Sequence, residues 1–278
     1  MKFISYLNLS RPGIFVGAFF SYMIGAGIAG GFDLYNVFIA ALVSLISTNF
    51  VYTFNSWADR DLDKIEKPDR PIPSGKISPK AAFNYSMFLL VLSVVYPFFF
   101  FNSPITLSHF MLFPFLGIIY SAEPIRLRNY PLAAVLVIVI GMQTPIRLGY
   151  YMNSSDNLLH PFFIIIFFMA LFIIPLKATE EAELDKKINA SNLYLKYGKK
   201  LLRFSLAGLV PCAAMAYLLD FDYRFKIFLF VFIPIVAVII SYYLFNSKNV
   251  HRLYESLKRT VAGVGILLII TLKIFKII

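Results

Sequence analysis

Long apolar segments recur along the whole chain and alternate with polar segments. Runs of about 20 mainly apolar residues predict membrane-spanning helices, because that length crosses a bilayer as a helix. We predict nine spans, at about residues 12–31, 36–55, 81–100, 106–121, 131–149, 159–177, 202–220, 225–246 and 260–277. The fourth is the weakest, because it is short and contains His109, Pro114 and Gly117. The pattern predicts an all-α membrane protein, a bundle of nine transmembrane helices in one domain over residues 1–278.

The basic residues are unevenly distributed between the two sides of this bundle. Long polar connections at 56–80, 122–130, 178–201 and 247–259 alternate with short ones. Counting residues at the span ends with the nearer connection, 21 of the 26 Lys and Arg residues lie in the amino-terminal segment and these long connections, and five lie elsewhere. The positive-inside rule then predicts a multi-pass protein of the cell membrane, with its amino terminus and polar cap loops in the cytoplasm.

Composition excludes several classes of function. The chain is 59% hydrophobic and 15% charged, where soluble domains carry about 25% charged residues. The net charge of +11 does not indicate nucleic-acid binding, because no basic run is interleaved with aromatic residues. It fits orientation in the membrane and contacts with anionic lipid headgroups. The single Cys212 lies in an apolar run and is expected to be a packing residue, and the three histidines are too scattered for a metal site.

An acidic patch follows the second predicted span. Asn55, Asp59 and Asp63 are spaced i, i+4, i+8, so on a continuing helix they share one face and turn only about 40° per step. Asp61 is expected to point away. Hard oxygen ligands on one face suit Mg²⁺, which also binds phosphate oxygens, and they do not suit Zn²⁺. The alternative interpretation is a solvated helix end.

A second acidic patch follows the sixth predicted span. Glu181 and Asp185 are again spaced i, i+4, with Glu180 beside them. Two carboxylate pairs could hold metal ions on both flanks of a diphosphate. The basic residues around them together suit the neutralisation of phosphate oxygens, although any single one is better explained as an orientation signal than as a ligand: Arg70, Arg126, Arg128, Lys177, Lys186 and Lys187.

Two further polar loops accompany the patches. In residues 119–128, Pro124 breaks the helix, and two interpretations stand equal: an ordinary turn at the headgroup boundary, or a third wall with Tyr120, Arg126 and Arg128 facing phosphates. In residues 68–75, three prolines exclude helix and Ser74-Gly75 permits a tight turn. We expect this loop to be a rigid cap.

These motifs resemble those of the UbiA-type intramembrane prenyltransferases. The spacing Asn-x3-Asp-x3-Asp from Asn55, followed by Arg-Pro-Ile-Pro-Ser-Gly from Arg70, is similar to the signature of that family. Residues 120–128 and 177–187 resemble the family's second and third cytoplasmic loops in order and spacing. The resemblance covers nearly the whole chain; its first motif is highly specific, whereas the other two would be weak alone.

The resemblance implies a prenyltransferase domain with an apolar tunnel beneath a cytoplasmic polar cap and a lateral opening to lipid. It implies that Mg²⁺ holds an isoprenyl diphosphate donor, whose ionisation gives an allylic cation for capture by a lipophilic acceptor. By the same resemblance, the first metal site is formed by Asn55, Asp59 and Asp63, and the second by Glu181 and Asp185. The residues that become diphosphate or acceptor contacts are Arg70, Tyr120, Arg126, Arg128 and Lys177.

Departures from the family pattern keep the reaction open. Ser56 and Ala178 stand where many members have Asp, and Glu181 where Asp is usual. Residues 67–75 most resemble two subgroups, the archaeal digeranylgeranylglyceryl phosphate synthases and the chlorophyll and bacteriochlorophyll synthases. We favour transfer of a geranylgeranyl group to a glycerol ether phosphate. The alternatives are prenylation of a tetrapyrrole or aromatic quinone precursor, and an intramembrane terpene cyclase.

Two other classes of protein are weighed against an enzyme. A transporter carries charges along its path through the membrane. Here the middles of the predicted spans are almost free of charge, with Arg147 near a span end as the main exception, and the acidic patches lie at one membrane face. A membrane scaffold would leave the spacing of Asn55, Asp59 and Asp63 unexplained.

Overall fold

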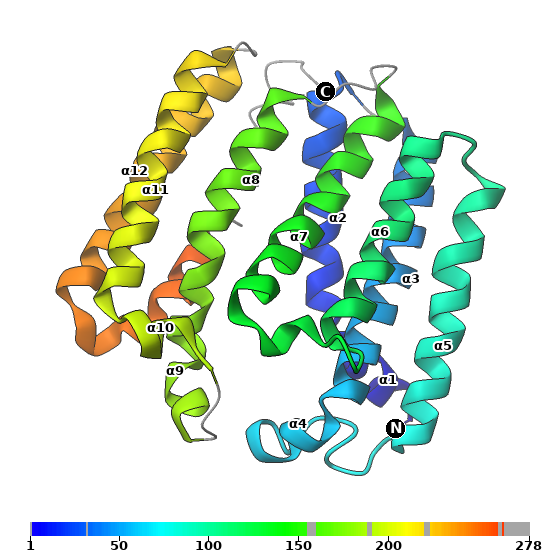
Figure 1. The fold of residues 1–278 in the computed structure, drawn as a ribbon. Helices are drawn as coiled ribbons and strands as arrows, with labels where there is room; N and C mark the ends of the chain where they lie inside the picture. Colours follow the sequence, from blue (N-terminus) through cyan, green and yellow to red (C-terminus); the bar gives the residue numbers. More distant parts are fainter. Residues whose placement is uncertain are drawn as a thin grey trace. The chain divides into compact units, whose positions relative to one another are not determined.

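The computed structural model describes residues 2–31, 33–154, 160–187, 191–219, 223–260 and 263, which are helical with loops and contain no strand (Figure 1). The chain divides into two compact units. Unit 1 comprises the described residues of Met1–Arg128 and Thr144–Asn157. Unit 2 comprises those of Asn129–Gln143 and Leu158–Thr271. Helix α7, Pro131–Asn153, contributes residues to both units.

Unit 1 is built around helix α3, Leu34–Ala58. This helix packs against α1 (Lys2–Ser10), α2 (Pro12–Ile28), α5 (Pro79–Val95) and α6 (Pro104–Ser121). Short α4, Arg60–Glu66, follows α3, and the 3₁₀ turn η1, Tyr96–Phe99, follows α5. Three long helices begin with an N-cap side chain that accepts a hydrogen bond from a backbone N–H group. These residues are Asp33 for α3, Ser78 for α5 and Ser103 for α6. The central position of α3 brings its polar end close to several loops.

Helices α2 and α7 approach each other at two glycines. A Cβ atom on Gly25 would lie 1.8 Å from the carbonyl oxygen of Ile146, and one on Gly149 would lie 2.0 Å from that of Tyr22. Close contact of helix backbones through small residues is the usual packing of membrane helices. These two positions therefore accept no side chain without separating the helices.

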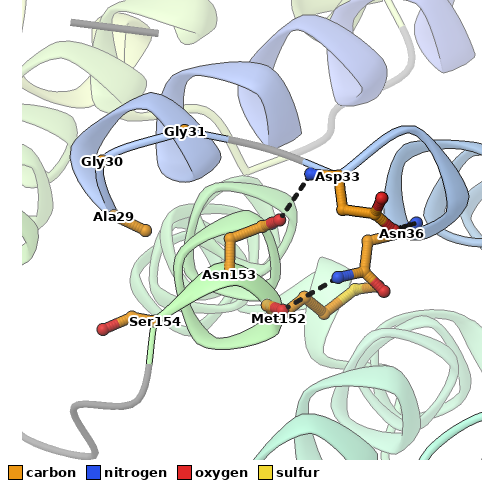
Figure 2. A pocket seen from close by; sticks show the side chains of 8 residues that line it. All are labelled: Ala29, Gly30, Gly31, Asp33, Asn36, Met152, Asn153 and Ser154. Carbon is orange, nitrogen blue, oxygen red and sulfur yellow. Dashed lines mark hydrogen bonds between the residues drawn. The ribbon is translucent and has the colours of Figure 1, made fainter.

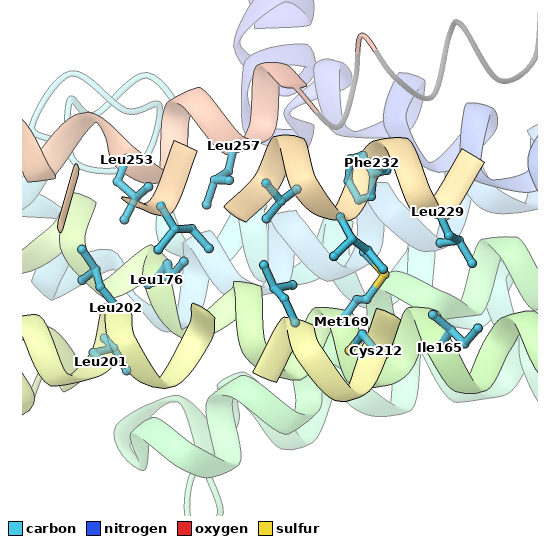
Figure 3. Packing of buried hydrophobic residues seen from close by; sticks show 14 of the residues in the cluster. Ile165, Met169, Leu176, Leu201, Leu202, Cys212, Leu229, Phe232, Leu253 and Leu257 are labelled. Atoms are coloured by element: carbon cyan, nitrogen blue, oxygen red, sulfur yellow. The ribbon is translucent and has the colours of Figure 1, made fainter. Parts of the chain in front are cut away.

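Unit 2 has a continuous apolar core (Figure 3). Its elements are α8 (Pro161–Ile173), η3 (Ile174–Lys177), α9 (Ala178–Lys187), α10 (Leu193–Tyr197), α11 (Lys199–Leu218), α12 (Tyr223–Phe245) and η4 (Ser247–Arg252). Cys212 is fully buried in this core, which agrees with a packing role. Leu253 and Leu257, after η4, are also buried there, so the connection after α12 folds back onto the core.

The chain is a multi-pass integral membrane protein. Within the described residues, six helices are long and apolar enough to cross a bilayer, and the pair Ile4–Ser10 and Gly13–Ile28, bent by 50°, raises the number to seven if it counts as one span. The shorter apolar helix Leu229–Phe245 corresponds to the eighth predicted span. The predicted fourth span, the weakest in sequence, is the 18-residue helix α6. The predicted ninth span falls almost entirely outside the described residues.

Candidate functional site

The first acidic patch lies where α3 ends. The sequence predicted a helix that continues through Asp63, but α3 ends at Ala58 and α4 begins at Arg60, with Asp59 between them. The i, i+4 hydrogen bonds continue across this break, from the N–H of Asp59 to the Asn55 carbonyl (2.9 Å) and from the N–H of Asp63 to the Asp59 carbonyl (2.8 Å). The three residues therefore remain on successive turns, and Asn55 Nδ2 also donates to Asp59 Oδ2 at 2.9 Å.

Both aspartates of this patch are buried, with 4% of Asp59 and 2% of Asp63 exposed. Burial of a carboxylate is costly unless a cation and hydrogen bonds compensate it. Arg126 Nη2 lies 3.2 Å from Asp59 Oδ1, and Arg128 Nη1 contacts Asp59 Oδ2. Arg70 Nη1 lies 2.6 Å from each oxygen of Asp63. Six of the predicted site residues thus form one cluster in unit 1.

Asp61 differs from its two neighbours, as the spacing predicted. Its side chain is 73% exposed and pairs with Lys64 at 2.8 Å. The hydrogen bond from Lys64 holds the pKa of the Asp61 carboxyl below its usual value. Asp61 is therefore a solvated partner of Lys64, outside the buried cluster.

The proline loop holds Arg70 in place. The N–H of Ser74 donates to the Arg70 carbonyl at 2.9 Å, and the N–H of Ile77 donates to the Pro71 carbonyl at 2.9 Å. Ile72 and Ile77 are buried, and with Leu9 of α1 they belong to a small apolar cluster. Gly75 takes a φ of +76°, which glycine adopts without strain. The loop is thus anchored by turns and by apolar contacts, in agreement with a rigid cap.

The loop after α6 forms a wall of the same cluster. Ser121, the last residue of α6, is buried, and its Oγ accepts a hydrogen bond from Asn55 Nδ2 at 3.2 Å. The N–H of Arg126 donates to the Ala122 carbonyl at 2.7 Å, and Arg126 Nη1 donates to Glu123 at 3.0 Å. The loop thus directs Arg126 and Arg128 at Asp59, and the interpretation that it faces phosphates stays a prediction. Predicted Tyr120 precedes Ser121 and is half-buried.

Arg11 is a member of the cluster that the sequence did not identify. It lies at the break between α1 and α2, in the left-handed backbone region at φ 50° and ψ 68°. Its guanidinium lies over the Tyr52 ring, 5.3 Å from the centroid, and interacts electrostatically with Asp63, Arg70 and Arg128. Arg-Pro at this position did indicate a helix break, because the residue before proline disfavours the helical conformation. Nothing in the sequence placed that break beside Asp63.

The charges of the cluster suit a metal ion bound together with an anion. Four arginines surround two buried carboxylates, so cations are in excess. The described residues contain no group of three or more His, Cys, Asp or Glu side chains that could hold a metal. Mg²⁺ commonly uses one or two carboxylates and completes its shell with water and phosphate oxygens. Asp59 and Asp63 fit that pattern, and the arginine forks suit phosphate oxygens.

A pocket of about 480 Å³ opens beside the cluster. It is lined by Asn8 of α1 and by the start of the proline loop, Glu66, Lys67, Pro68, Asp69, Arg70 and Pro71. Arg70 belongs to both the pocket and the Asp63 pair. The pocket therefore gives a polar group direct access to one of the cluster's arginines.

The second acidic patch lies in unit 2 and has different surroundings. Glu181, whose side chain is 45% exposed, pairs with Lys177 at 3.0 Å. Asp185 Oδ2 accepts a hydrogen bond from Asn192 Nδ2 at 2.5 Å, and that amide also donates to the Ala178 carbonyl at 3.0 Å. Asn192 caps α10, so Asp185 links α9 to the start of the next helix. The predicted metal ligands of this patch also serve local structure.

The connection after α12 contributes residues that the sequence did not assign to the second patch. Lys258 Nζ lies 3.3 Å from Glu180 and 2.6 Å from Glu255, and 5.3 Å from the centroid of the Tyr254 ring. Burial raises the pKa of the Tyr254 phenol, and nearby Lys177 and Lys258 oppose this shift. The packing of η4 against α9 brings these residues together. The contact between Lys258 and Glu180 could not be predicted, because the two residues lie far apart in the sequence.

A second pocket in unit 1 is lined by residues that hold helices together (Figure 2). It has a volume of about 550 Å³ and lies at the α2–α3 connection and the end of α7. The N–H of Asp33 donates to Asn153 Oδ1 at 3.4 Å, and Asn36 Nδ2 donates to the Met152 carbonyl at 3.2 Å. Asn153 Nδ2 donates to the Tyr22 hydroxyl at 3.1 Å. These bonds join α2, the start of α3 and the end of α7, and no arginine lines the pocket.

Comparison with known proteins gives the same family at every level. The UbiA prenyltransferase family matches residues 15–261. The chain is 28% identical over 238 residues to digeranylgeranylglyceryl phosphate synthase of Methanosphaera stadtmanae, covering 84% of this chain and 83% of that protein. It is 31% identical over 204 residues to probable homogentisate phytyltransferase 2 of Oryza sativa subsp. japonica, covering 66% of this chain and 52% of that protein.

Solved structures share the fold. The structure of a UbiA homologue from Archaeoglobus fulgidus bound to GPP and Mg²⁺ superposes with a TM-score of 0.71 at 19% identity, covering 95% of this chain and 99% of that one. A structure concerned with digeranylgeranylglyceryl phosphate synthase in membranes gives a TM-score of 0.76 at 23% identity, covering 98% of each chain. With the family match across nearly all of its length, the chain belongs to the UbiA prenyltransferase family.

Proposed function

We propose that this prenyltransferase moves a geranylgeranyl group from its diphosphate to a glycerol ether phosphate, in a Mg²⁺-dependent reaction. The observation that carries the proposal is the pair of buried carboxylates, Asp59 and Asp63, set among four arginines in unit 1. The names of relatives such as the Methanosphaera stadtmanae synthase support the acceptor class. The Archaeoglobus fulgidus structure with GPP and Mg²⁺ supports the donor class and the metal.

The polar residues of the two patches have two proposed roles, as metal ligands and as contacts of the diphosphate or the acceptor. Asn55, Asp59 and Asp63 are the proposed ligands of Mg²⁺, and Glu181 and Asp185 are a proposed second pair. A bound Mg²⁺ supplies positive charge where the departing diphosphate becomes more negative. Arg70, Tyr120, Arg126, Arg128 and Lys177 are proposed to contact the diphosphate or the acceptor, and we add Arg11 to this group because it interacts electrostatically with Asp63 and Arg70.

The apolar helices would protect the reaction from water. Breaking of the carbon–oxygen bond leaves an allylic cation on the isoprenyl chain, and the diphosphate departs with the electron pair. The acceptor hydroxyl oxygen then bonds to the cation's terminal carbon and loses its proton. Exclusion of water by the apolar surroundings keeps hydrolysis from competing with this capture.

We propose that residues 1–278 form one prenyltransferase domain of nine transmembrane helices in the cell membrane. The family match from residue 15 to 261 extends across both units and supports a single domain. We also propose that the amino terminus and both acidic patches lie in the cytoplasm. The location of 21 of the 26 basic residues in the amino-terminal segment and long connections supports this orientation.

The test is incubation of the purified protein with Mg²⁺, radiolabelled geranylgeranyl diphosphate and one acceptor at a time. The acceptors are a geranylgeranylglyceryl phosphate, an aromatic quinone precursor and a tetrapyrrole carboxylate. We expect radiolabelled product with the glycerol ether phosphate. Product with the aromatic acceptor would instead follow the likeness to the phytyltransferase. Diphosphate release without any acceptor product would indicate a cyclase, and no Mg²⁺-dependent consumption would contradict a prenyltransferase.

A further inference from the structure

All four carboxylate oxygens of Asp59 and Asp63 contact a guanidinium group. Arg126 Nη2 lies 3.2 Å from Asp59 Oδ1, and Arg128 Nη1 contacts Asp59 Oδ2. Arg70 Nη1 lies 2.6 Å from both oxygens of Asp63. These are the oxygens that the proposed function gives to Mg²⁺. A divalent metal and three arginines therefore need the same oxygen atoms.

We infer that Arg70, Arg126 and Arg128 exchange partners during donor binding, from the carboxylates of Asp59 and Asp63 to the donor's diphosphate. The arginines hold the carboxylates in place, leave them when a divalent metal binds there, and then bind the diphosphate oxygens. This inference rests on the proposed function and deepens it. Its consequence is that metal and diphosphate bind as a coupled pair.

Charge explains the direction of the coupling. Two buried carboxylates and four arginines, with Arg11 included, give the cluster a net charge of about +2, and a divalent metal alone would raise it to about +4. A diphosphate group with about three negative charges returns the cluster to about +1. Each ligand thus favours the binding of the other, and such coupling is reciprocal.

Arg126 provides independent support for binding of the diphosphate. Its Nε atom is buried and has no hydrogen-bond partner among the described residues. A buried donor without an acceptor is costly, and a phosphate oxygen beside Asp59 would satisfy it. Arg126 Nη1 keeps its bond to the exposed Glu123 at 3.0 Å, so the side chain stays near the cluster when Asp59 releases it.

The exchange needs arginines that a ligand can reach, and the structure provides them. The side chains of Arg70, Arg126 and Arg128 are 25%, 22% and 24% exposed, whereas those of Asp63 and Asp59 are 3% and 5% exposed. The carboxylates are therefore fixed and nearly inaccessible, and the guanidinium groups form the accessible layer of the cluster. A ligand arriving from solvent meets the arginines first.

The test measures metal binding in place of turnover. Mn²⁺ replaces Mg²⁺, and its affinity for the detergent-purified full chain is measured by calorimetry and by electron paramagnetic resonance, with and without inorganic diphosphate. We expect diphosphate to raise the Mn²⁺ affinity of the wild type about tenfold or more, a coupling of ordinary size. In Arg126→Gln and in Arg128→Gln, we expect Mn²⁺ alone to bind about fivefold more tightly, with a smaller effect of diphosphate.

Arg60→Gln is the matched control, because it removes the same charge at the start of α4. Arg60 lies 3.8 Å from the exposed Asp61, donates to the Trp57 carbonyl at 3.0 Å and contacts neither Asp59 nor Asp63 in the structure's described contacts. We expect its Mn²⁺ affinity to match the wild type under both conditions. Arg126→Lys keeps the charge without the fork and is expected to lie between the wild type and Arg126→Gln. Thermal unfolding midpoints show which variants remain folded.

Several outcomes would overturn the exchange. One is Mn²⁺ affinity without diphosphate that is unchanged or weaker in both folded glutamine variants. Another is the same gain in Arg60→Gln, which would indicate a general charge effect. A third is an Mn²⁺ affinity of the wild type that is the same with and without inorganic diphosphate. In each case Mg²⁺-dependent prenyl transfer by the wild type would still uphold the proposed function, whereas its absence would overturn that function separately.

Discussion

The two acidic patches have similar sequences and different surroundings. Each places carboxylates four residues apart after an apolar span, yet Asp59 and Asp63 are buried under arginines, and Glu181 is 45% exposed and pairs with a lysine. Arginine binds carboxylates and phosphates through a rigid planar fork, whereas the lysine ammonium is a mobile, strongly hydrated charge. The loops that pack over a helix end, and not the spacing on it, decide which environment forms.

The difference also concerns what holds each carboxylate. Asp59 and Asp63 are fixed by cations that a metal must displace, so the first patch is set up for exchange of ligands. Asp185 is fixed by Asn192, an amide that also caps α10. Removing the cation that pairs with a buried carboxylate is costly unless another cation takes its place. The second patch lacks that constraint and is expected to contribute less to donor binding.

The largest effect is expected from Asp63→Asn. It removes a proposed metal ligand and the partner of Arg70, so we expect kcat to fall by about 1,000-fold or more. Asp61→Asn is the control, since Asp61 is exposed and pairs with Lys64, and it should stay within about twofold of the wild type. The measurement is steady-state prenyl transfer with both proteins checked for folding and membrane insertion. Normal turnover in folded Asp63→Asn would remove this residue from the metal site.

Glu181→Gln tests whether the second patch acts on the reaction at all. We expect kcat to fall by about 100-fold, because a charge that supports the departing diphosphate is lost. Glu183→Gln, an exposed position on the same helix, should have little effect. A titration of rate against Mg²⁺ concentration separates weaker metal binding from slower chemistry. An unaffected rate would mean that this patch binds no metal.

Arg11→Gln tests the residue that the structure adds to the first patch. Arg11 lies over Tyr52 and interacts with Asp63 and Arg70. Loss of one charge-assisted contact to the donor should raise KM for the diphosphate by about tenfold, with a smaller change in kcat. Arg203→Gln, on the exposed side of α11, is the matched control. An unchanged KM would leave Arg11 as a structural residue.

The smallest effect is expected from Asn192→Ala, and it concerns stability. The variant loses the cap of α10 and the bonds to Asp185 and to the Ala178 carbonyl, at a cost of about 1–2 kcal/mol. The thermal unfolding midpoint should fall accordingly. Asp185→Asn separates the two roles of that carboxylate: lost activity at nearly full stability supports a metal ligand, and the reverse supports a purely structural partner.

The sequence predicted the elements of the fold and most of the first patch. Apolar length located the six helices of the described chain that are long and apolar enough to span a membrane, because the span length is fixed by the bilayer. Helical spacing placed Asn55, Asp59 and Asp63 on successive turns, since hydrogen bonding to residue i−4 repeats along any helix. The break at Asp59 was missed, because no proline or glycine marks it.

Contacts between distant segments could not be predicted in the same way. Arg11 interacts electrostatically with Asp63 and Arg70 from the bend between α1 and α2, and Lys258 contacts Glu180 where the connection after α12 packs on α9. Neither contact leaves a periodic pattern in the sequence, since both depend on tertiary packing. The arginines of the first patch were predicted as phosphate contacts, and their pairing with Asp59 and Asp63 required the structure.

Through the buried side chain of Leu9, helix α1 supports the proline loop that carries Arg70. Leu9 is only 2% exposed and packs with Ile72 and Ile77, the two apolar anchors of the loop that carries Arg70. Two residues later, Arg11 enters the cluster itself. Trimming α1, or fusing a rigid partner directly to it, is therefore expected to loosen Arg11 and Arg70, two of the proposed diphosphate contacts, while leaving the long membrane helices intact. Affinity tags for purification belong at the other end of the protein, or on a long flexible spacer.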